Sequence, residues 1–335
     1  MKQKTLLDEE NRLELLSQLG DPLEILNRVI KWEKFRSVLN QGSRKEDTGK
    51  GGRPSYDVVM MFKILVLQRL YNLSDDQTEY QINDRMSFMR FLGINLCEKV
   101  PDAKTIWKFK NDLAETETVD KLFCMFDEHL KKEGLISHKG TIVDAPRQRN
   151  SRDENNKIKN GEIPEEWEKP ENKSKLAQKD TDADWTKKNG ERHFGYKDHV
   201  KCDADSKLIT NYSITSASVH DSQRCLVFIG QEDEVLYADS AYSGKPIALA
   251  LPENCKNQIC EKGYRNSPLT SEQKMNNRRK SRIRCRIEHI FGFMTGAMHG
   301  ITIRSIGITR AWMNIGITNL VYNFCRYSYL KRASA

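Results

Sequence analysis

Two short apolar segments that end in aspartate constrain the fold of this chain more than any other feature. Residues 141–143 are Thr-Ile-Val and precede Asp144, and residues 235–238 form a second apolar run that precedes Asp239. Runs of this length and composition are typical of buried strands. Buried strands need cover on their faces, which the helices predicted elsewhere in the chain can supply. The sequence therefore predicts an α/β domain with an acid at the end of each of two strands.

The first 120 residues or so are predicted to be helical. Residues 57–73 carry apolar side chains around most of a helix circumference, which indicates a buried helix. Ser74 and Gln77 form a capping-box pattern for a second helix that reaches about Phe91. Asp102 is the predicted N-cap of a third helix.

Lysines on the third helix make this region a candidate for DNA binding. Lys104 and Lys108 are four residues apart and share one helix face. Small all-α modules with basic edges include helix-turn-helix DNA-binding units, although most three-helix modules are packing units. We expect an N-terminal helical domain over residues 1–135 that binds DNA ends, and a second domain over residues 136–335.

Residues 147–192, directly after the first strand, differ in composition from the rest of the chain. They include 12 basic and 11 acidic side chains and few apolar ones, so they cannot bury enough apolar surface to fold unaided. We expect a disordered or surface insertion, with Trp167 and Trp185 as apolar exceptions that dock onto other residues. Beyond it we predict a β-hairpin of residues 193–202 and 207–215, a helix at 223–230, a strand at 258–261, one long helix at 276–298 and an apolar helix at 312–330.

The positive charge of the chain is concentrated late in the sequence. The formal net charge is +8, and residues 262–304 contain ten basic residues against only Glu272 and Glu288. This segment therefore accounts for the whole excess. A focused positive surface favours a polyanionic partner such as DNA. A solvated helix face is the alternative interpretation of an isolated basic run.

Composition excludes some classes of protein. No run approaches the roughly 18 to 20 apolar residues that a membrane helix needs. Charged residues follow Met1 where a secretory signal has an apolar stretch. The eight cysteines include no Cys-x-x-Cys pair, so we expect reduced thiols rather than a zinc site. These features predict a cytoplasmic protein.

Three acids form the candidate catalytic set, namely Asp144, Asp239 and Glu288. Carboxylates from two strand ends and a helix are ligands that Mg²⁺ or Mn²⁺ prefers, and two such ions can stabilise both the attacking and the leaving oxygen of a phosphoryl transfer. Each acid also has an ordinary interpretation. Strand-end aspartates often form turns or caps, and Glu288 can pair with Arg284 one helical turn away. The order of the acids and the adjacent basic segment favour the metal site.

A series of sequence blocks spread over most of the chain matches one known family. In the N-terminal part these blocks are residues 52–56 (Gly-Arg-Pro-Ser-Tyr), 73–76 (Leu-Ser-Asp-Asp), 91–93 (Phe-Leu-Gly) and 101–106 (Pro-Asp-Ala-Lys-Thr-Ile). In the second part they are residues 142–145 (Ile-Val-Asp-Ala), 194–199 (Phe-Gly-Tyr-Lys-Asp-His), 219–221 (Val-His-Asp), 237–244 (Tyr-Ala-Asp-Ser-Ala-Tyr-Ser-Gly) and 284–292 (Arg-Cys-Arg-Ile-Glu-His-Ile-Phe-Gly). The chain thus resembles bacterial DDE transposases of the insertion-sequence five group.

This resemblance implies a ribonuclease H-like fold with a mixed sheet flanked by helices and an acidic triad. Carried over residue by residue, the triad is Asp144, Asp239 and Glu288, which would hold two Mg²⁺ or Mn²⁺ ions. The implied function is transposition: binding the inverted-repeat ends of an insertion sequence, cleaving them and joining the 3′-hydroxyl strands to target DNA. The implied partner is double-stranded DNA, bound at the bacterial nucleoid by a homodimer or a larger assembly.

The sequence departs from the family pattern at two positions beside the glutamate. Ser281 stands where the family has a tyrosine, three positions before Arg284, and Thr295 stands where it has a lysine. Both usual side chains contact DNA, so we expect other residues to do so here. The candidates are Lys280, Arg282, Arg284 and Arg286.

His199 and His220 are candidates for supporting the acids rather than for catalysis. His199 lies in a predicted strand, where an imidazole is ordinarily buried with its hydrogen bonds satisfied. His220 can cap or orient the helix that follows, together with Asp221.

Three other functions remain open from the sequence. The chain can be a catalytically inactive DNA-binding relative, or a nuclease that cuts without joining strands. It can also be an interaction protein whose basic helix binds RNA.

Overall fold

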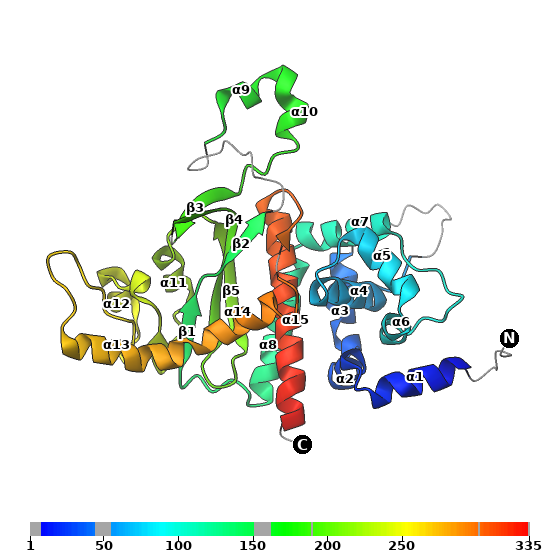
Figure 1. Cartoon of the computed structure of the whole chain (residues 1–335), viewed down its shortest axis with the longest axis horizontal. Helices are drawn as coiled ribbons and strands as arrows, with labels where there is room; N and C mark the ends of the chain where they lie inside the picture. The colour runs from blue at the N-terminus through cyan, green and yellow to red at the C-terminus, as the bar shows by residue number, and fades with distance from the viewer. Residues whose placement is uncertain (1–7, 44–54, 151–161, 189, 301, 334–335) are drawn as a thin grey trace. The chain divides into compact units, whose positions relative to one another are not determined.

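The computed structural model describes residues 8–43, 55–150, 162–188, 190–300 and 302–333 (Figure 1). By compactness the chain divides into one unit of Met1–Leu122 with Phe324–Ala335 and a second unit of Phe123–Asn323. This division falls inside helix α8 (Thr118–Lys132), whereas the expected boundary at 135/136 follows that helix. The assignment of separate end-binding and catalytic domains stays a prediction. Residues 52–54 of the first matching block and 151–161 of the expected insertion lie outside the described residues.

The first unit is helical, as predicted. The Asp57 carboxylate accepts hydrogen bonds of 3.0 Å from the backbone N–H groups of Val59 and Met60 and so begins the buried helix α4. Ser74 and Gln77 make the predicted capping box at the start of α5. The helices before α8 are α1 (Asp8–Gln18), α2 (Pro22–Val29), the 3-10 turn η1 (Trp32–Phe35), α3 (Arg36–Gly42), α4 (Val58–Leu70), α5 (Asp75–Asp84), α6 (Met86–Leu92) and α7 (Ala103–Glu115).

The helix predicted to run from Ser74 to about Phe91 is in fact two helices. Arg85 adopts an extended conformation (φ −108°, ψ 114°) between α5 and α6. The break redirects the chain so that the short α6 buries four apolar side chains, and Gly93 ends it in the left-handed region (φ 75°). The guanidinium of Arg85 lies 5.1 Å from the ring centroid of Phe88, a cation–π contact at the break.

The second unit is built on a mixed eight-stranded sheet. β4 pairs antiparallel with β1 and β5, whereas β1, β6 and β7 are mutually parallel neighbours. Helices pack against this sheet, and Phe228 of α11 and Ile247 of α12 are buried with Val143 and Leu236. The predicted fold class is therefore confirmed (Figure 1). The strands are β1 (Thr141–Asp144), β2 (Arg147–Asn150), β3 (Asp184–Lys188), β4 (Glu191–Asp203), β5 (Ile209–Ser216), β6 (Val235–Tyr237), β7 (Lys256–Asn257) and β8 (Thr302–Ile303).

The remaining elements of this unit are short helices and two long ones. They are α9 (Glu165–Glu168), η2 (Pro170–Asn172), α10 (Lys173–Leu176), α11 (Ser222–Phe228), η3 (Ser240–Tyr242), α12 (Lys245–Ala250), α13 (Ser271–Arg284), α14 (Arg286–Thr295) and α15 (Ile308–Ala333).

Part of the expected insertion belongs to the sheet, which corrects the prediction. β1 and β2 lie on the same edge of β4 in one continuous register, with Asp144 opposite Val200 and Arg147 opposite Lys197. Pro146 separates the two strands, because proline cannot donate to a ladder. β3 also pairs with β4. Strand pairing therefore orders a polar sequence that lacks the apolar residues to fold alone.

A glycine is required at position 195, where the backbones of the paired strands β2 and β4 approach closely. It has a φ of 145°, and a Cβ there would lie 2.2 Å from the carbonyl oxygen of Gln148.

Both tryptophans of the expected insertion dock as predicted. Trp185 packs on Phe194 with ring centroids 5.3 Å apart, and Trp167 is buried.

Two late elements also differ from the predictions. The strand expected at 258–261 is β7, two residues earlier, although the N–H of Cys260 still donates to Ala238 at 3.0 Å. The long helix expected at 276–298 begins earlier, at Ser271, and is interrupted at Cys285. The interruption separates α13, which buries no residue, from α14, which buries an apolar stripe.

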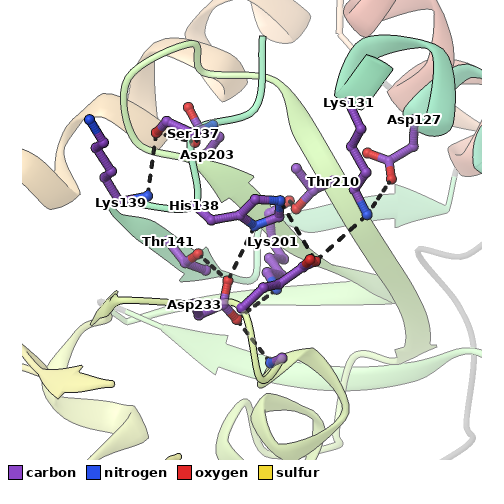
Figure 2. A network of polar contacts seen from close by, with 12 residues as sticks. Asp127, Lys131, Ser137, His138, Lys139, Thr141, Lys201, Asp203, Thr210 and Asp233 are labelled. Carbon is purple, nitrogen blue, oxygen red and sulfur yellow. Dashed lines mark hydrogen bonds and ion pairs between the residues drawn. The ribbon is translucent and has the colours of Figure 1, made fainter. Parts of the chain in front are cut away.

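A buried polar network fastens β1 to its two neighbours at the end remote from Asp144 (Figure 2). The Asp233 carboxylate, 1% exposed, accepts hydrogen bonds from Thr141 Oγ1 at 2.7 Å and from Lys201 Nζ at 2.8 Å. Thr141 begins β1, Lys201 lies in β4, and Asp233 precedes β6. This network favours the strand register that brings the ends of β1 and β6 together.

All eight cysteines are free thiols in this structure. Among the described residues, no helix is long and apolar enough to cross a membrane.

Candidate active site

Arg284 connects two of the three predicted acids. Its Nη1 lies 3.5 Å from Asp144 Oδ2, and its Nη2 lies 3.0 Å from Glu288 Oε1. Asp144 ends β1, Arg284 ends α13, and Glu288 lies in the first turn of α14. The side chains of Asp144 and Arg284 are 22% and 20% exposed, whereas that of Glu288 is 56% exposed. The predicted ion pair on the helix face therefore exists and also reaches the sheet.

Asp239 lies at the end of the strand next to Asp144. β6 pairs parallel with β1, with Ile142 opposite Tyr237. Asp239 follows the end of β6 by two residues, and the negative charges of both aspartates act on the buried hydroxyl of Tyr242. Asp239 also has the ordinary role of a cap, because its Oδ1 accepts a 2.7 Å hydrogen bond from the N–H of Ala241. The second carboxylate oxygen is not used by that cap.

Tyr242 is a buried residue near the two aspartates that we did not predict individually. Its side chain is fully buried, and its hydroxyl has no hydrogen-bond partner among the described residues. Burial raises the pKa of Tyr242 strongly, and the negative charges of Asp144, Asp221 and Asp239 add to this effect. The sequence signal was its place in the block at 237–244. Tyr242 is thus a core residue whose buried hydroxyl lies within electrostatic reach of Asp144, Asp221 and Asp239.

A buried lysine holds the loop that leads into α11. Lys197 Nζ lies 2.9 Å from Asp221 Oδ1 and donates to the carbonyl oxygen of Val219 at 2.5 Å. Lys197 is only 6% exposed. Neither residue was predicted as functional, although each belongs to a matching block, at 194–199 and 219–221. The pair positions Asp221 near Tyr242.

His199 lies in β4 and His220 just before α11. The His199 Nδ1 has no hydrogen-bond partner among the described residues, so the prediction that its hydrogen bonds are satisfied is wrong for this atom. His199 is fully buried, its Nε2 lies 2.8 Å from Thr215 Oγ1, and burial lowers its pKa to about 4. It is therefore neutral at physiological pH. His220 is exposed and its Nδ1 lies 2.8 Å from Ser222 Oγ, at the start of α11. This contact agrees with the helix-capping interpretation of His220.

Besides Arg284, two of the predicted DNA-binding residues make contacts within the protein. Lys280 Nζ donates to the carbonyl oxygen of Ile259 at 2.9 Å. Arg286 Nη1 donates at 2.9 Å to the carbonyl oxygen of Ala204 and to Asp205, in the turn between β4 and β5. Together with the contact of Arg284 with Asp144, the hydrogen bonds of Lys280 and Arg286 hold α13 and α14 against the sheet.

A second set of cations on α13 faces solvent. Arg282, a predicted DNA contact, is exposed together with three other cations of the predicted basic segment, Lys274, Arg278 and Arg279. Lys274, Arg278 and Arg282 are spaced by four residues and so line one face, at about 6 Å intervals along the helix axis. Within the described residues, none of these side chains makes a hydrogen bond or ion pair.

Lys104 and Lys108 lie in the first unit. Both are exposed on α7, as expected for residues that bind a ligand or solvent. Between them in the sequence, Trp107 is 52% exposed. An exposed tryptophan beside lysines is compatible with a nucleic-acid surface, because bases stack on aromatic rings.

The donor set fits a hard divalent cation. Asp144, Asp239 and Glu288 offer only carboxylate oxygens, which Mg²⁺ and Mn²⁺ prefer. The same acids already attract a cation in this structure, since the guanidinium of Arg284 touches two of them. Among the described residues, however, no three His, Cys, Asp or Glu side chains are grouped closely enough to hold a metal ion as they stand.

Two protein-family models match this chain. A model described as Transposase DDE domain matches residues 138–324, which is more than half of the chain. The chain belongs to the DDE transposase family. In this transposase the match contains all three candidate acids. A second model, described as Transposase domain (DUF772), matches residues 10–112.

A solved structure similar to this transposase is that of a piggyBac transposase synaptic complex with hairpin DNA. The two chains are 13% identical, the similarity covers 93% of this chain and 73% of that chain, and the TM-score is 0.43.

Proposed function

We propose that this protein is the transposase of a bacterial insertion sequence, of the insertion-sequence five group. It binds the terminal inverted repeats, cleaves the ends and transfers the 3′-hydroxyl strands to target DNA. The observation that carries this proposal is that the guanidinium of Arg284 contacts both Asp144 and Glu288. Asp144 ends β1, and β1 pairs with β6, the strand that precedes Asp239.

In the proposed mechanism the protein aligns the reacting DNA. Asp144, Asp239 and Glu288 would hold two Mg²⁺ or Mn²⁺ ions, which would supply activation of the attacking oxygen and stabilisation of the leaving oxygen in an in-line displacement. Asp144 and Asp239 are anchored by rigid parallel strands, which fixes the geometry that the reaction needs.

The outer face of α13 is the proposed phosphate-binding surface of this unit. Its cations Lys274, Arg278, Arg279 and Arg282 are exposed, whereas Lys280 and Arg286 are engaged by the protein. Cations that face solvent can neutralise DNA phosphates without breaking other contacts. Lys104 and Lys108 on α7 are a second candidate surface, in the first unit.

Replacing the three aligned cations together (K274Q/R278Q/R282Q) should reduce the salt dependence of DNA binding. Each neutralised phosphate contributes about 0.9 to the slope of log K against log salt, so the slope should fall by about 2.7. Titration of a labelled random duplex between 50 and 200 mM salt measures this slope.

The matched control replaces the two engaged cations, Lys280 and Arg286, by Gln. We expect this variant to keep the wild-type salt slope and to lose thermal stability instead. A reduced slope in the control, with an unchanged slope in the triple variant, would show that DNA contacts the other side of α13.

Incubating the full chain with duplexes that carry the element's own ends, Mg²⁺ and a target plasmid tests the function as a whole. Cut ends and joined products are expected. Cutting without joining would favour a nuclease, and binding without cutting would favour a catalytically inactive relative. Crosslinking in the same reaction reports whether two protomers pair the ends, as proposed.

A further inference from the structure

The guanidinium of Arg284 lies where it neutralises two acids at once. Nη2 is 3.0 Å from Glu288, an i,i+4 neighbour, and Nη1 is 3.5 Å from Asp144 on a different element. The forked guanidinium suits this task, because it presents several donors in one plane and stays charged at every relevant pH. Without a cation between them, neighbouring carboxylates would repel one another.

The carboxylates of Asp144 and Glu288 cannot keep their contacts with Arg284 and also coordinate a divalent ion fully. Mg²⁺ holds carboxylate oxygens at about 2.0 to 2.1 Å in a near-ideal octahedron. A guanidinium in hydrogen-bond contact with Asp144 Oδ2 occupies space and lone pairs that such a ligand set needs. The longer of the two contacts is the one to Asp144, so this is the contact expected to open first.

We propose that Arg284 is a stand-in cation, which holds Asp144 and Glu288 in register in the metal-free protein and is displaced from Asp144 when a divalent ion binds. The released edge of the guanidinium is then available to a DNA phosphate, so that loading of the ions is coupled to contact with DNA. This inference rests on the proposed function, because it takes these acids as the metal site.

The decisive measurement is the affinity of the DNA-free, full-length protein for Mn²⁺, followed by the electron paramagnetic resonance signal of the free ion. If Arg284 competes with the ion, Arg284→Gln should bind Mn²⁺ about ten-fold more tightly than wild type. Arg284→Lys keeps a cation at this position, and we expect it to remain within about three-fold of wild type. The size of the effect is what one partly exposed, charge-assisted contact supports.

Arg286 provides the matched control. It is two residues away and bonds to the turn between β4 and β5, not to Asp144 or Glu288. Arg286→Gln should therefore leave the Mn²⁺ affinity unchanged. A thermal melt without metal tests whether Arg284 stabilises the metal-free site. Arg284→Gln should then be less stable than wild type, and Mn²⁺ should raise the melting temperature of Arg284→Gln more than that of wild type.

Asp144→Asn separates failure of this inference from failure of the proposed site. If Asp144→Asn loses Mn²⁺ binding while Arg284→Gln binds no more tightly than wild type, the stand-in role is overturned and the metal site remains. If Asp144→Asn binds Mn²⁺ as wild type does, the proposed metal site itself is wrong, and the inference is overturned with it.

Discussion

Replacing Asp144 by Asn, Asp239 by Asn or Glu288 by Gln should each abolish Mg²⁺-dependent cleavage of the element's ends. The amides keep the shape of the side chains but remove the charge that binds the ions. Lewis-acid stabilisation is worth several kcal/mol, and every 1.36 kcal/mol is ten-fold in rate, so we expect losses of at least about a thousand-fold. Single-turnover cleavage of a labelled duplex measures the rate.

DNA binding by the same variants distinguishes a chemical role from a folding defect. Each variant should bind the ends at least as well as wild type, because removing a negative charge near phosphates does not weaken attraction. Glu272→Gln is a matched control, since Glu272 is an exposed acid in the first turn of α13, and it should cleave normally. Full cleavage by any one of the three variants would remove that acid from the site.

Asp198→Asn should make the protein more resistant to unfolding above neutral pH. Asp198 is fully buried in β4, and one of its oxygens accepts a 3.2 Å hydrogen bond from Asn319 Nδ2 of α15. The other carboxylate oxygen and Asn319 Oδ1 have no partner among the described residues. A proton on Asp198 would supply the missing donor, and burial raises the pKa of Asp198 to about 7.

The sign of the effect follows from this raised pKa. The folded protein holds the proton of Asp198 up to about pH 7, whereas the unfolded chain releases it near pH 4. The stability that wild type derives from this group is therefore full below about pH 4 and is lost as pH rises through 7. Between pH 5 and pH 8 wild type should lose on the order of 2.5 kcal/mol relative to Asp198→Asn.

Urea unfolding of both proteins at a series of pH values measures this difference. Glu272→Gln, a change at an exposed acid, should follow wild type at every pH. Parallel stability curves for wild type and Asp198→Asn would mean that Asp198 is ionised in the folded protein.

Much of the local structure was predictable because short-range chemistry determines it. The Ser74 capping box and the Asp102 cap involve residues within one turn, so the sequence alone located these helix starts. The break at Arg85 was missed, because it depends on where α6 finds a core to bury its apolar residues. The pairing of β2 with β4 was missed for the same reason, since composition does not report a neighbouring strand.

The sequence by itself determined the fold class and the family and singled out three candidate acids, because these follow from strand composition, residue order and matching blocks. Only the tertiary structure decided that β6, the strand before Asp239, pairs with the strand that ends in Asp144, and that Arg284 reaches both Asp144 and Glu288. It also decided which cations of α13 face solvent and which ones hold the helix in place. The physical reason is that charge and spacing are properties of the chain, whereas the partner of each charge depends on the elements that pack next to it.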